Sequence, residues 1–218
     1  MKTDYDLQRD ILEELRWEPS VKSQDIGVAV HDGVVTLTGN VPTYAEKFAA
    51  EDAAKRVPGV RAIAEELIVN LFGAHVRNDS DIAQATTNAL DWNVTVPNGK
   101  VKTMVENGWI TLSGDVEWNF QRDAARDSVR HLMGVKGVTN LMHVIQPSVS
   151  TSEVRGNIES ALKRSMQENA DNITIEAHHG KVTLRGKVDS WEAYNDAGRA
   201  AWSAPGVSTV ENDLVLTN

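Results

Sequence analysis

The sequence contains no cysteine. This absence excludes disulfide bonds, thiolate metal sites and cysteine nucleophiles together. The sequence also has no apolar run near the roughly 20 residues that a transmembrane helix needs, and its charged start, MKTDYDLQRDILEEL, is unlike the apolar core of a secretory signal. We therefore expect no transmembrane segment. We expect a cytoplasmic location for the chain as written, or a periplasmic one if an N-terminal precursor segment has been removed.

Basic residues are few relative to acidic ones. The 218 residues include 22 lysines and arginines against 31 aspartates and glutamates, which gives a formal net charge of −9. A strongly acidic surface repels polyanions over long distances and attracts cations. We therefore expect no nucleic-acid partner.

One short pattern occurs three times. It is written HDGVVTLTGNV from residue 31, ENGWITLSGDV from residue 106 and HHGKVTLRGKV from residue 178. The glycines and valines of the three copies are separated by 75 and then by 72 residues, with no gap inside any copy. A constant register of this kind indicates duplication of a folding unit. We place the three domains at residues 1–69, 78–144 and 150–218.

Each unit begins with the signals of an amphipathic helix. Thr3, Asn78 and Ser150 are helix-capping residue types, and each is followed three positions later by a carboxylate. Apolar residues then recur at helical spacing in all three units, although Thr86 breaks the apolar stripe of the middle one. In the first unit the stripe consists of Leu7, Ile11 and Leu15.

Alternating apolar residues follow the first helix and predict a hairpin. In the first unit the two strands contain Ile26, Val28 and Val30, then Val35 and Leu37. An alanine-rich stretch that predicts a second helix comes next, and a last alternating segment completes the unit. Because a β-α-β crossover is right-handed, the last strand should run parallel to the second. The predicted fold class is α+β: three tandem α-β-β-α-β units, each with two helices on one face of a three-stranded mixed sheet.

The repeated glycines raise the question of whether they cradle a phosphate or turn the chain. They lack the strand–loop–helix context of a phosphate-binding loop. The dipeptides DG, NG and HG at the hairpin tips instead have the chemistry of a tight antiparallel turn. We therefore interpret the glycines as structural: Gly33, Gly108 and Gly180 at the tips, Gly39, Gly114 and Gly186 at the strand ends, and Gly59, Gly134 and Gly206 after the second helices.

The unit resembles the BON domain, a family found in bacterial osmotic-shock and nodulation-related proteins. The segments that carry the resemblance are VTLTGNV…PGVRAIAEELIV, ITLSGDV…MGVKGVTNLMHV and VTLRGKV…APGVSTVENDLVL. The first copy departs from the others with Glu65, where they have Asn140 and Asn212, and the second has Met133 in the place of a proline. The resemblance covers practically the whole chain.

The resemblance implies a non-enzymatic protein of the osmotic stress response. We expect a binding or scaffold role at the cell envelope, at a phospholipid surface or on a protein partner. The alternative that the resemblance leaves open is a cytoplasmic module that responds to a cation, potassium, through backbone carbonyl ligands. No other cofactor is expected, and the sequence leaves the oligomeric state open.

Residue types that support catalysis or metal binding are present but not in the required groups. His31, His178 and His179 lie at the predicted hairpin tips, without further ligands that would converge on them. Ser113 occupies a position that is threonine or arginine in the other units, and no oriented base accompanies it. We expect no enzyme, no catalytic residue and no metal site.

The tryptophans are the remaining signal for interaction. Trp17 and Trp92 share one position late in the first helix, where we interpret them as semi-exposed packing residues. Trp109 is out of phase with the core positions of its strand, so we expect it on the helix-free face of the sheet, with Val34 and Lys181 at the same position in the other units. These three residues are a candidate interaction surface, and we favour packing between domains over partner binding there.

Overall fold

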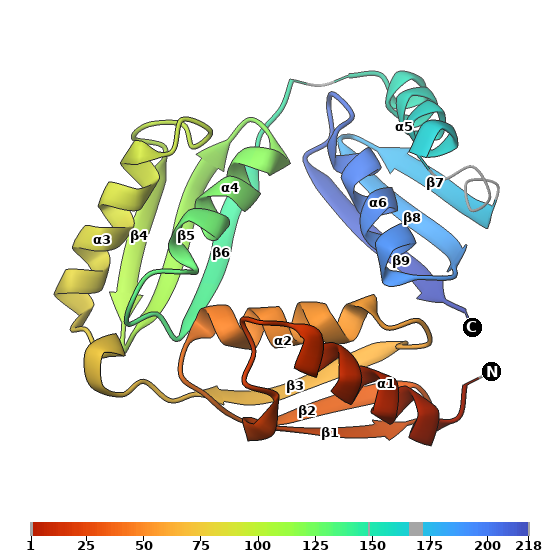
Figure 1. The fold of residues 1–218 in the computed structure, drawn as a ribbon. Coiled ribbons are helices and arrows are strands. Elements are labelled where there is room, and N and C mark those ends of the chain that lie inside the picture. The colour runs from red at the N-terminus through yellow and green to blue at the C-terminus, as the bar shows by residue number, and fades with distance from the viewer. Residues whose placement is uncertain (1, 148, 166–171, 218) are drawn as a thin grey trace. The chain divides into compact units, whose positions relative to one another are not determined.

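The computed structural model describes residues 2–147, 149–165 and 172–217. Within them, the chain forms three separate three-stranded sheets, ordered β1-β2-β3, β4-β5-β6 and β7-β8-β9 (Figure 1). Each sheet has one helix before its first strand and another between its second and third strands. The predicted α-β-β-α-β order is therefore confirmed in all three repeats.

The three repeats use elements of nearly the same length. The first comprises α1 (Asp4–Trp17), β1 (Ile26–His31), β2 (Val34–Val41), α2 (Tyr44–Arg56) and β3 (Ala62–Val69), with a short 3-10 helix at Ser23–Asp25. The second comprises α3 (Asp79–Trp92), β4 (Val101–Glu106), β5 (Trp109–Val116), α4 (Asn119–Val129) and β6 (Gly137–Val144). The third comprises α5 (Thr151–Ser165), β7 (Ile173–His178), β8 (Lys181–Val188), α6 (Trp191–Trp202) and β9 (Thr209–Leu216).

Strand directions follow the prediction. β1 pairs antiparallel with β2, and β2 pairs parallel with β3. The third repeat has the same arrangement, with β7 antiparallel and β9 parallel to the central strand β8. Each sheet is therefore mixed, as the right-handed crossover rule required.

Chain contacts divide the protein into two compact units. The first unit consists of Met1–Ser113 with Ala124–Leu141, and the second consists of Gly114–Asp123 with Met142–Asn218. The first repeat thus lies wholly in the first unit and the third repeat wholly in the second. The boundary crosses the middle repeat within β5, α4 and β6.

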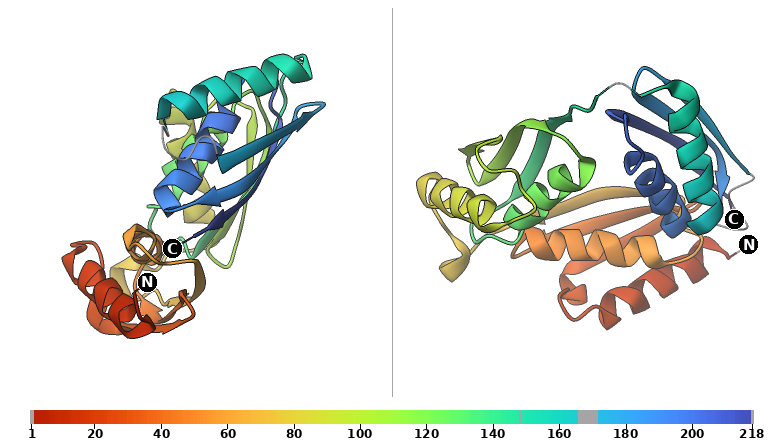
Figure 2. Two further views of the ribbon diagram at one scale, coloured as in Figure 1. Left: turned by 90° about the vertical axis from the view of Figure 1, so that its right-hand side faces the viewer. Right: turned by 90° about the horizontal axis from the view of Figure 1, so that it is seen from above.

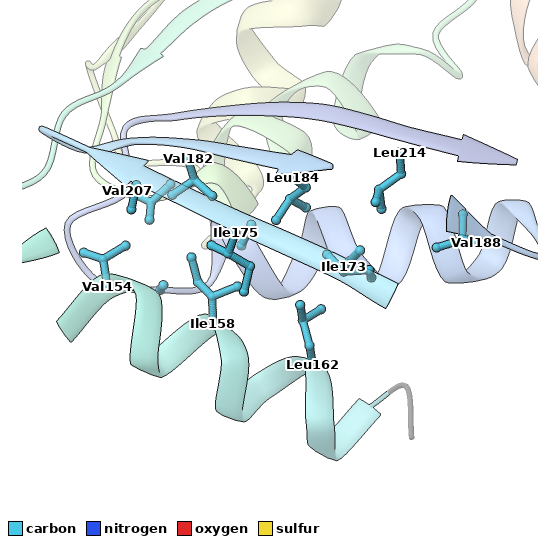
Figure 3. Close-up of a cluster of buried hydrophobic side chains, with 14 of the residues drawn as sticks. Val154, Ile158, Leu162, Ile173, Ile175, Val182, Leu184, Val188, Val207 and Leu214 are labelled. Atoms are coloured by element: carbon cyan, nitrogen blue, oxygen red, sulfur yellow. The ribbon is translucent and has the colours of Figure 1, made fainter. Parts of the chain in front are cut away.

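The third repeat shows how each core is built. α5 contributes Val154, Ile158 and Leu162, and α6 contributes small alanines, to one cluster with the inward residues of the three strands (Figure 3). Figure 2 shows both helices on the same side of this sheet. The alanines allow α6 to approach the sheet closely. The opposite face of the sheet carries neither of these two helices.

Helix starts confirm the predicted caps. The Thr3 and Asn78 side chains accept hydrogen bonds from the backbone amides of Asp6 and Asp81, three residues later. Thr86, the polar residue in the apolar stripe of its helix, is fully buried between Ile82 and Leu90 on the same face. Its hydroxyl has no hydrogen-bond partner in the part of the chain that the structure describes.

The departure at Glu65 has a local compensation. Glu65 pairs with Leu37 on the core side of the sheet and forms an ion pair with Lys47 of α2 at 2.7 Å. In the third repeat, Asn212 takes the place of Glu65 and Tyr194 takes the place of Lys47. There the Asn212 side-chain amide donates to the Tyr194 backbone carbonyl, at 3.0 Å. The second helix and the last strand are thus linked by different chemistry in the two repeats.

Candidate interaction surfaces

The candidate surface residues lie at the start of the central strands of the three sheets. Val34, Trp109 and Lys181 are the first residues of β2, β5 and β8, and all three are exposed. The next residues along these strands are Val35, Ile110 and Val182, which are fully buried. Since neighbouring strand residues point to opposite faces, the three candidates lie on the helix-free faces. They belong to three separate sheets.

Trp109 makes its described contacts within its own sheet. Its indole Nε1 donates to the Thr139 hydroxyl on β6 at 2.7 Å, and its ring covers Gly137, where an added Cβ would come within 2.5 Å of it. The side chain is still 48% exposed. Trp109 therefore presents an apolar surface to its surroundings, and its role in packing between domains stays a prediction.

The helix-free face of the third repeat carries paired charges. Lys181 forms an ion pair with Glu211 at 2.5 Å, and this contact lowers the pKa of the Glu211 carboxyl. Arg185 forms an ion pair with Glu176 on the neighbouring strand at 3.0 Å. The third repeat thus has an ion-paired lysine at the position where the second repeat has the exposed Trp109 indole.

Two exposed tryptophans lie elsewhere, at the ends of the first helices of the first two repeats. Trp17 is the last residue of α1 and Trp92 the last residue of α3, and they are 83% and 88% exposed. The interpretation of both as semi-exposed packing residues is therefore wrong. Val94, two residues after Trp92, is also exposed and extends this apolar tip.

Helical phase explains the exposure of both tryptophans. Each follows the last core residue of its helix, Leu15 or Leu90, by two positions. Two residues turn an α-helix by about 200°, which places both indoles opposite the buried stripe. This two-residue spacing between the last core leucine and the tryptophan can be read from the sequence alone. In the third repeat, the exposed Arg164 takes this position.

The hairpin tips are held by backbone geometry and by a carboxylate. Asn107 and Gly108 both have positive φ, 52° and 82°, as a two-residue type I′ turn requires. The Asp79 carboxylate, at the start of α3, accepts hydrogen bonds from both backbone amides, at 2.7 and 2.9 Å. Asp4 binds the tip of the first repeat in the same way. The tip amides thus bind a side chain of their own repeat.

The residues considered for catalysis or metal binding lie on different elements of the fold. His31 and His178 are exposed at the last positions of β1 and β7, in different sheets. Ser113 lies within β5. Among the described residues, no group of three or more histidines, aspartates or glutamates could hold a metal ion.

A cavity of about 460 Å³ in the first compact unit contains a carboxylate in an unusual environment. Asp52 of α2 lines it together with Phe48, Arg56, Arg130 and Glu18. Burial raises the pKa of the Asp52 carboxyl, and the smaller attraction of Lys55 opposes this effect. The described contacts give Asp52 no ion pair of its own within 4 Å, whereas Arg56 is paired with Glu18 at 2.9 Å.

We expect Asp52→Asn to stabilise the protein at neutral pH. A carboxyl whose pKa is higher in the folded than in the unfolded state lowers the stability of the protein at any pH at which it stays charged on folding. This cost disappears as the pH falls below the pKa of the unfolded state. The melting temperature of the variant should therefore exceed that of the parent at pH 7, and the two should converge at acidic pH. A variant that melts below the parent at pH 7 would show that burial is not the dominant effect.

No helix of the described residues combines the length and the apolar composition that a bilayer crossing demands.

Comparisons with curated proteins find bacterial relatives that resemble about half of the chain. Osmotically-inducible protein Y of Escherichia coli (strain K12) is 32% identical over 132 residues, 56% of this chain and 62% of that protein. The 21 kDa hemolysin of Actinobacillus pleuropneumoniae is 30% identical over 123 residues, 56% and 63% of the two chains. Outer membrane lipoprotein DolP of Haemophilus influenzae is 31% identical over 115 residues, 52% and 59%. Each match spans less than two thirds of the relative.

Solved structures add no functional argument. The C-terminal domain of CdsD, a structural protein of the type III secretion system of Chlamydia trachomatis, aligns over 100% of both chains. Its sequence identity is 16% and its TM-score is 0.28, a value too low to support any inference.

The family match accounts for almost every residue. The BON domain model matches residues 3–70, 78–146 and 150–218, and these segments contain the three α-β-β-α-β repeats described above. The chain therefore belongs to the BON domain family and carries the domain in three tandem copies.

Proposed function

We propose that this protein is a non-enzymatic, stress-associated component of the bacterial cell envelope that binds phospholipid surfaces through the exposed tryptophans of its first two repeats. The relatives named for osmotic induction and for the outer membrane support the stress and envelope parts of the proposal. They favour the periplasmic alternative over a cytoplasmic location. The single observation that carries the lipid part is the exposure of Trp17 and Trp92 at matching helix ends.

Tryptophan suits a membrane surface for a physical reason. Its indole is amphipathic and concentrates at the level of the lipid headgroups. Removing an aromatic side chain of this size from water contributes about 1.5–3 kcal/mol to the free energy of membrane binding. The contribution of a second tryptophan adds to the first when both indoles reach the same bilayer. Neither indole pays a packing penalty on insertion, because both are exposed in the free protein.

Charge sets the type of bilayer that should be bound. The net charge of −9 opposes long-range attraction to anionic lipids. Binding should therefore depend on insertion of the indoles, and it should respond weakly to salt. Vesicles of zwitterionic phosphatidylcholine should bind at least as well as vesicles containing phosphatidylglycerol.

Co-sedimentation with phosphatidylcholine vesicles tests this proposal. We expect Trp17→Ser and Trp92→Ser each to weaken binding about tenfold or more, which is the loss that 1.5–3 kcal/mol implies, and the double variant to stay in the supernatant. Trp109→Ser is the matched control, because Trp109 is an exposed tryptophan on a sheet face. Unchanged binding of the double variant would refute the proposal, and loss of binding in the Trp109 variant would move the surface to the sheet.

The potassium alternative has no observation among the described residues that favours it. A melting temperature that is higher in potassium than in sodium chloride at equal ionic strength would revive it.

A further inference from the structure

A contact between repeats occurs within the first compact unit. The guanidinium carbon of Arg130 lies 4.1 Å from the centroid of the Phe48 ring. Phe48 belongs to the N-terminal half of α2, and Arg130 directly follows the end of α4. The Arg130 side chain is only 20% exposed, and cation–π contacts are strongest when they are shielded from water.

A second observation supports the same junction. Tyr44 lies one turn before Phe48 on α2. Burial raises the pKa of the Tyr44 hydroxyl, and a hydrogen bond with the backbone of Val138, in β6 of the second repeat, opposes this effect. The N-terminal half of α2 therefore meets the second repeat at two points.

A corresponding contact occurs within the second compact unit. The guanidinium carbon of Arg122 lies 4.7 Å from the centroid of the Trp202 ring. Arg122 belongs to the N-terminal half of α4, and Trp202 is the last residue of α6. Trp202 also packs against the core of the third repeat, which fixes the orientation of its ring.

The two contacts use matching positions of the repeats. Arg130 and Trp202 are 72 residues apart, which is the interval between corresponding positions of the second and third repeats. Arg122 corresponds to Lys47, the neighbour of Phe48. In both cases, the N-terminal half of one second helix meets the end of the second helix in the next repeat. The cation and the aromatic ring have exchanged sides between the two contacts.

We propose that successive repeats dock head to tail through one recurring site on their second helices, in which a guanidinium stacked on an aromatic ring selects the partner repeat. The partner of each site is the next repeat of the same chain. The exchange of sides makes the junctions specific, because Arg122 would face Arg130 of a second copy with like charge. This inference does not depend on lipid binding, because Trp17 and Trp92 take no part in either contact.

Substitutions that move the positive charge between Phe48 and Arg130 test the first junction in the full-length protein. Phe48→Arg sets two arginines against each other, and we expect nitrogen-15 relaxation to show that the first repeat then tumbles faster than the second. The exchanged double variant, Phe48→Arg with Arg130→Phe, rebuilds the pair in the other orientation and should restore the parent rotational correlation time. Circular dichroism reports whether each variant stays folded. Phe120→Arg is the control, because Phe120 is an exposed aromatic of α4.

The second junction provides an independent test. Trp202→Arg should uncouple the third repeat from the second, and the double variant Arg122→Trp with Trp202→Arg should couple them again. Trp202 also packs on the core of its own repeat, so Trp202→Arg could lower the melting temperature of that repeat. In that case Arg122→Glu is the variant to use, and it should uncouple the same two repeats. Unchanged tumbling in Phe48→Arg and Arg122→Glu, or a failure of both exchanged pairs to restore coupling, would overturn the proposal.

Discussion

Gly186→Val is expected to unfold the third repeat while the first repeat stays folded. Gly186 has a φ of +143°, and a Cβ built on it would lie 2.0 Å from the backbone oxygen of Asn172. Valine is strained at this φ, and a backbone atom cannot move away as a flexible side chain can. We expect a loss of about 3–5 kcal/mol, which is a large part of the stability of so small a domain.

Hydrogen exchange resolved by repeat measures this effect. Amides of the third repeat should lose protection, and those of the first should keep it. Gly156→Ala in α5 is the matched control, because nothing lies within 4 Å of its added Cβ. Alanine in a helix interior should raise the free energy of unfolding by about 0.5–1 kcal/mol relative to glycine. Gly186→Val with parent-like protection but a changed ligand affinity would instead support a binding role for the strand-end glycines.

Asp79→Ala is expected to destabilise the second repeat by about 2 kcal/mol, because it removes two charge-assisted hydrogen bonds to the hairpin tip. The third repeat offers the reverse experiment. Thr151, the first residue of α5, corresponds to Asp79 and has one side-chain oxygen where aspartate has two. Thr151→Asp should therefore stabilise its repeat. Chemical denaturation of both variants checks the pair, and equal midpoints for Asp79→Ala and the parent would contradict it.

The architecture could be predicted from the sequence because its signals are local and are repeated three times. A constant register identified the units, the capping residues marked the helix starts, and the DG and NG dipeptides identified the turns. A pattern seen once is ambiguous, whereas three copies in register average out exceptions such as Thr86. That threonine is buried because the apolar residues around it outweigh its own polarity.

The interaction surfaces were harder to predict. The exposure of Trp17 and Trp92 follows from helical phase relative to Leu15 and Leu90, but the aromatic side chains favoured a packing interpretation. The contacts of Phe48 with Arg130 and of Arg122 with Trp202 could not be found from spacing, because they join residues of different repeats. Such contacts depend on how folded repeats dock, and this information is not local.

Fluorine NMR of the full-length protein labelled with 5-fluorotryptophan tests the central claim most directly. The six tryptophans give separate signals that single substitutions assign, and a spin-labelled phospholipid in small phosphatidylcholine bicelles broadens the signals of indoles that enter the lipid. The account predicts that Trp17 and Trp92 broaden strongly and that Trp109 and Trp202 do not. Broadening centred on Trp109, or no broadening at any tryptophan, would contradict it.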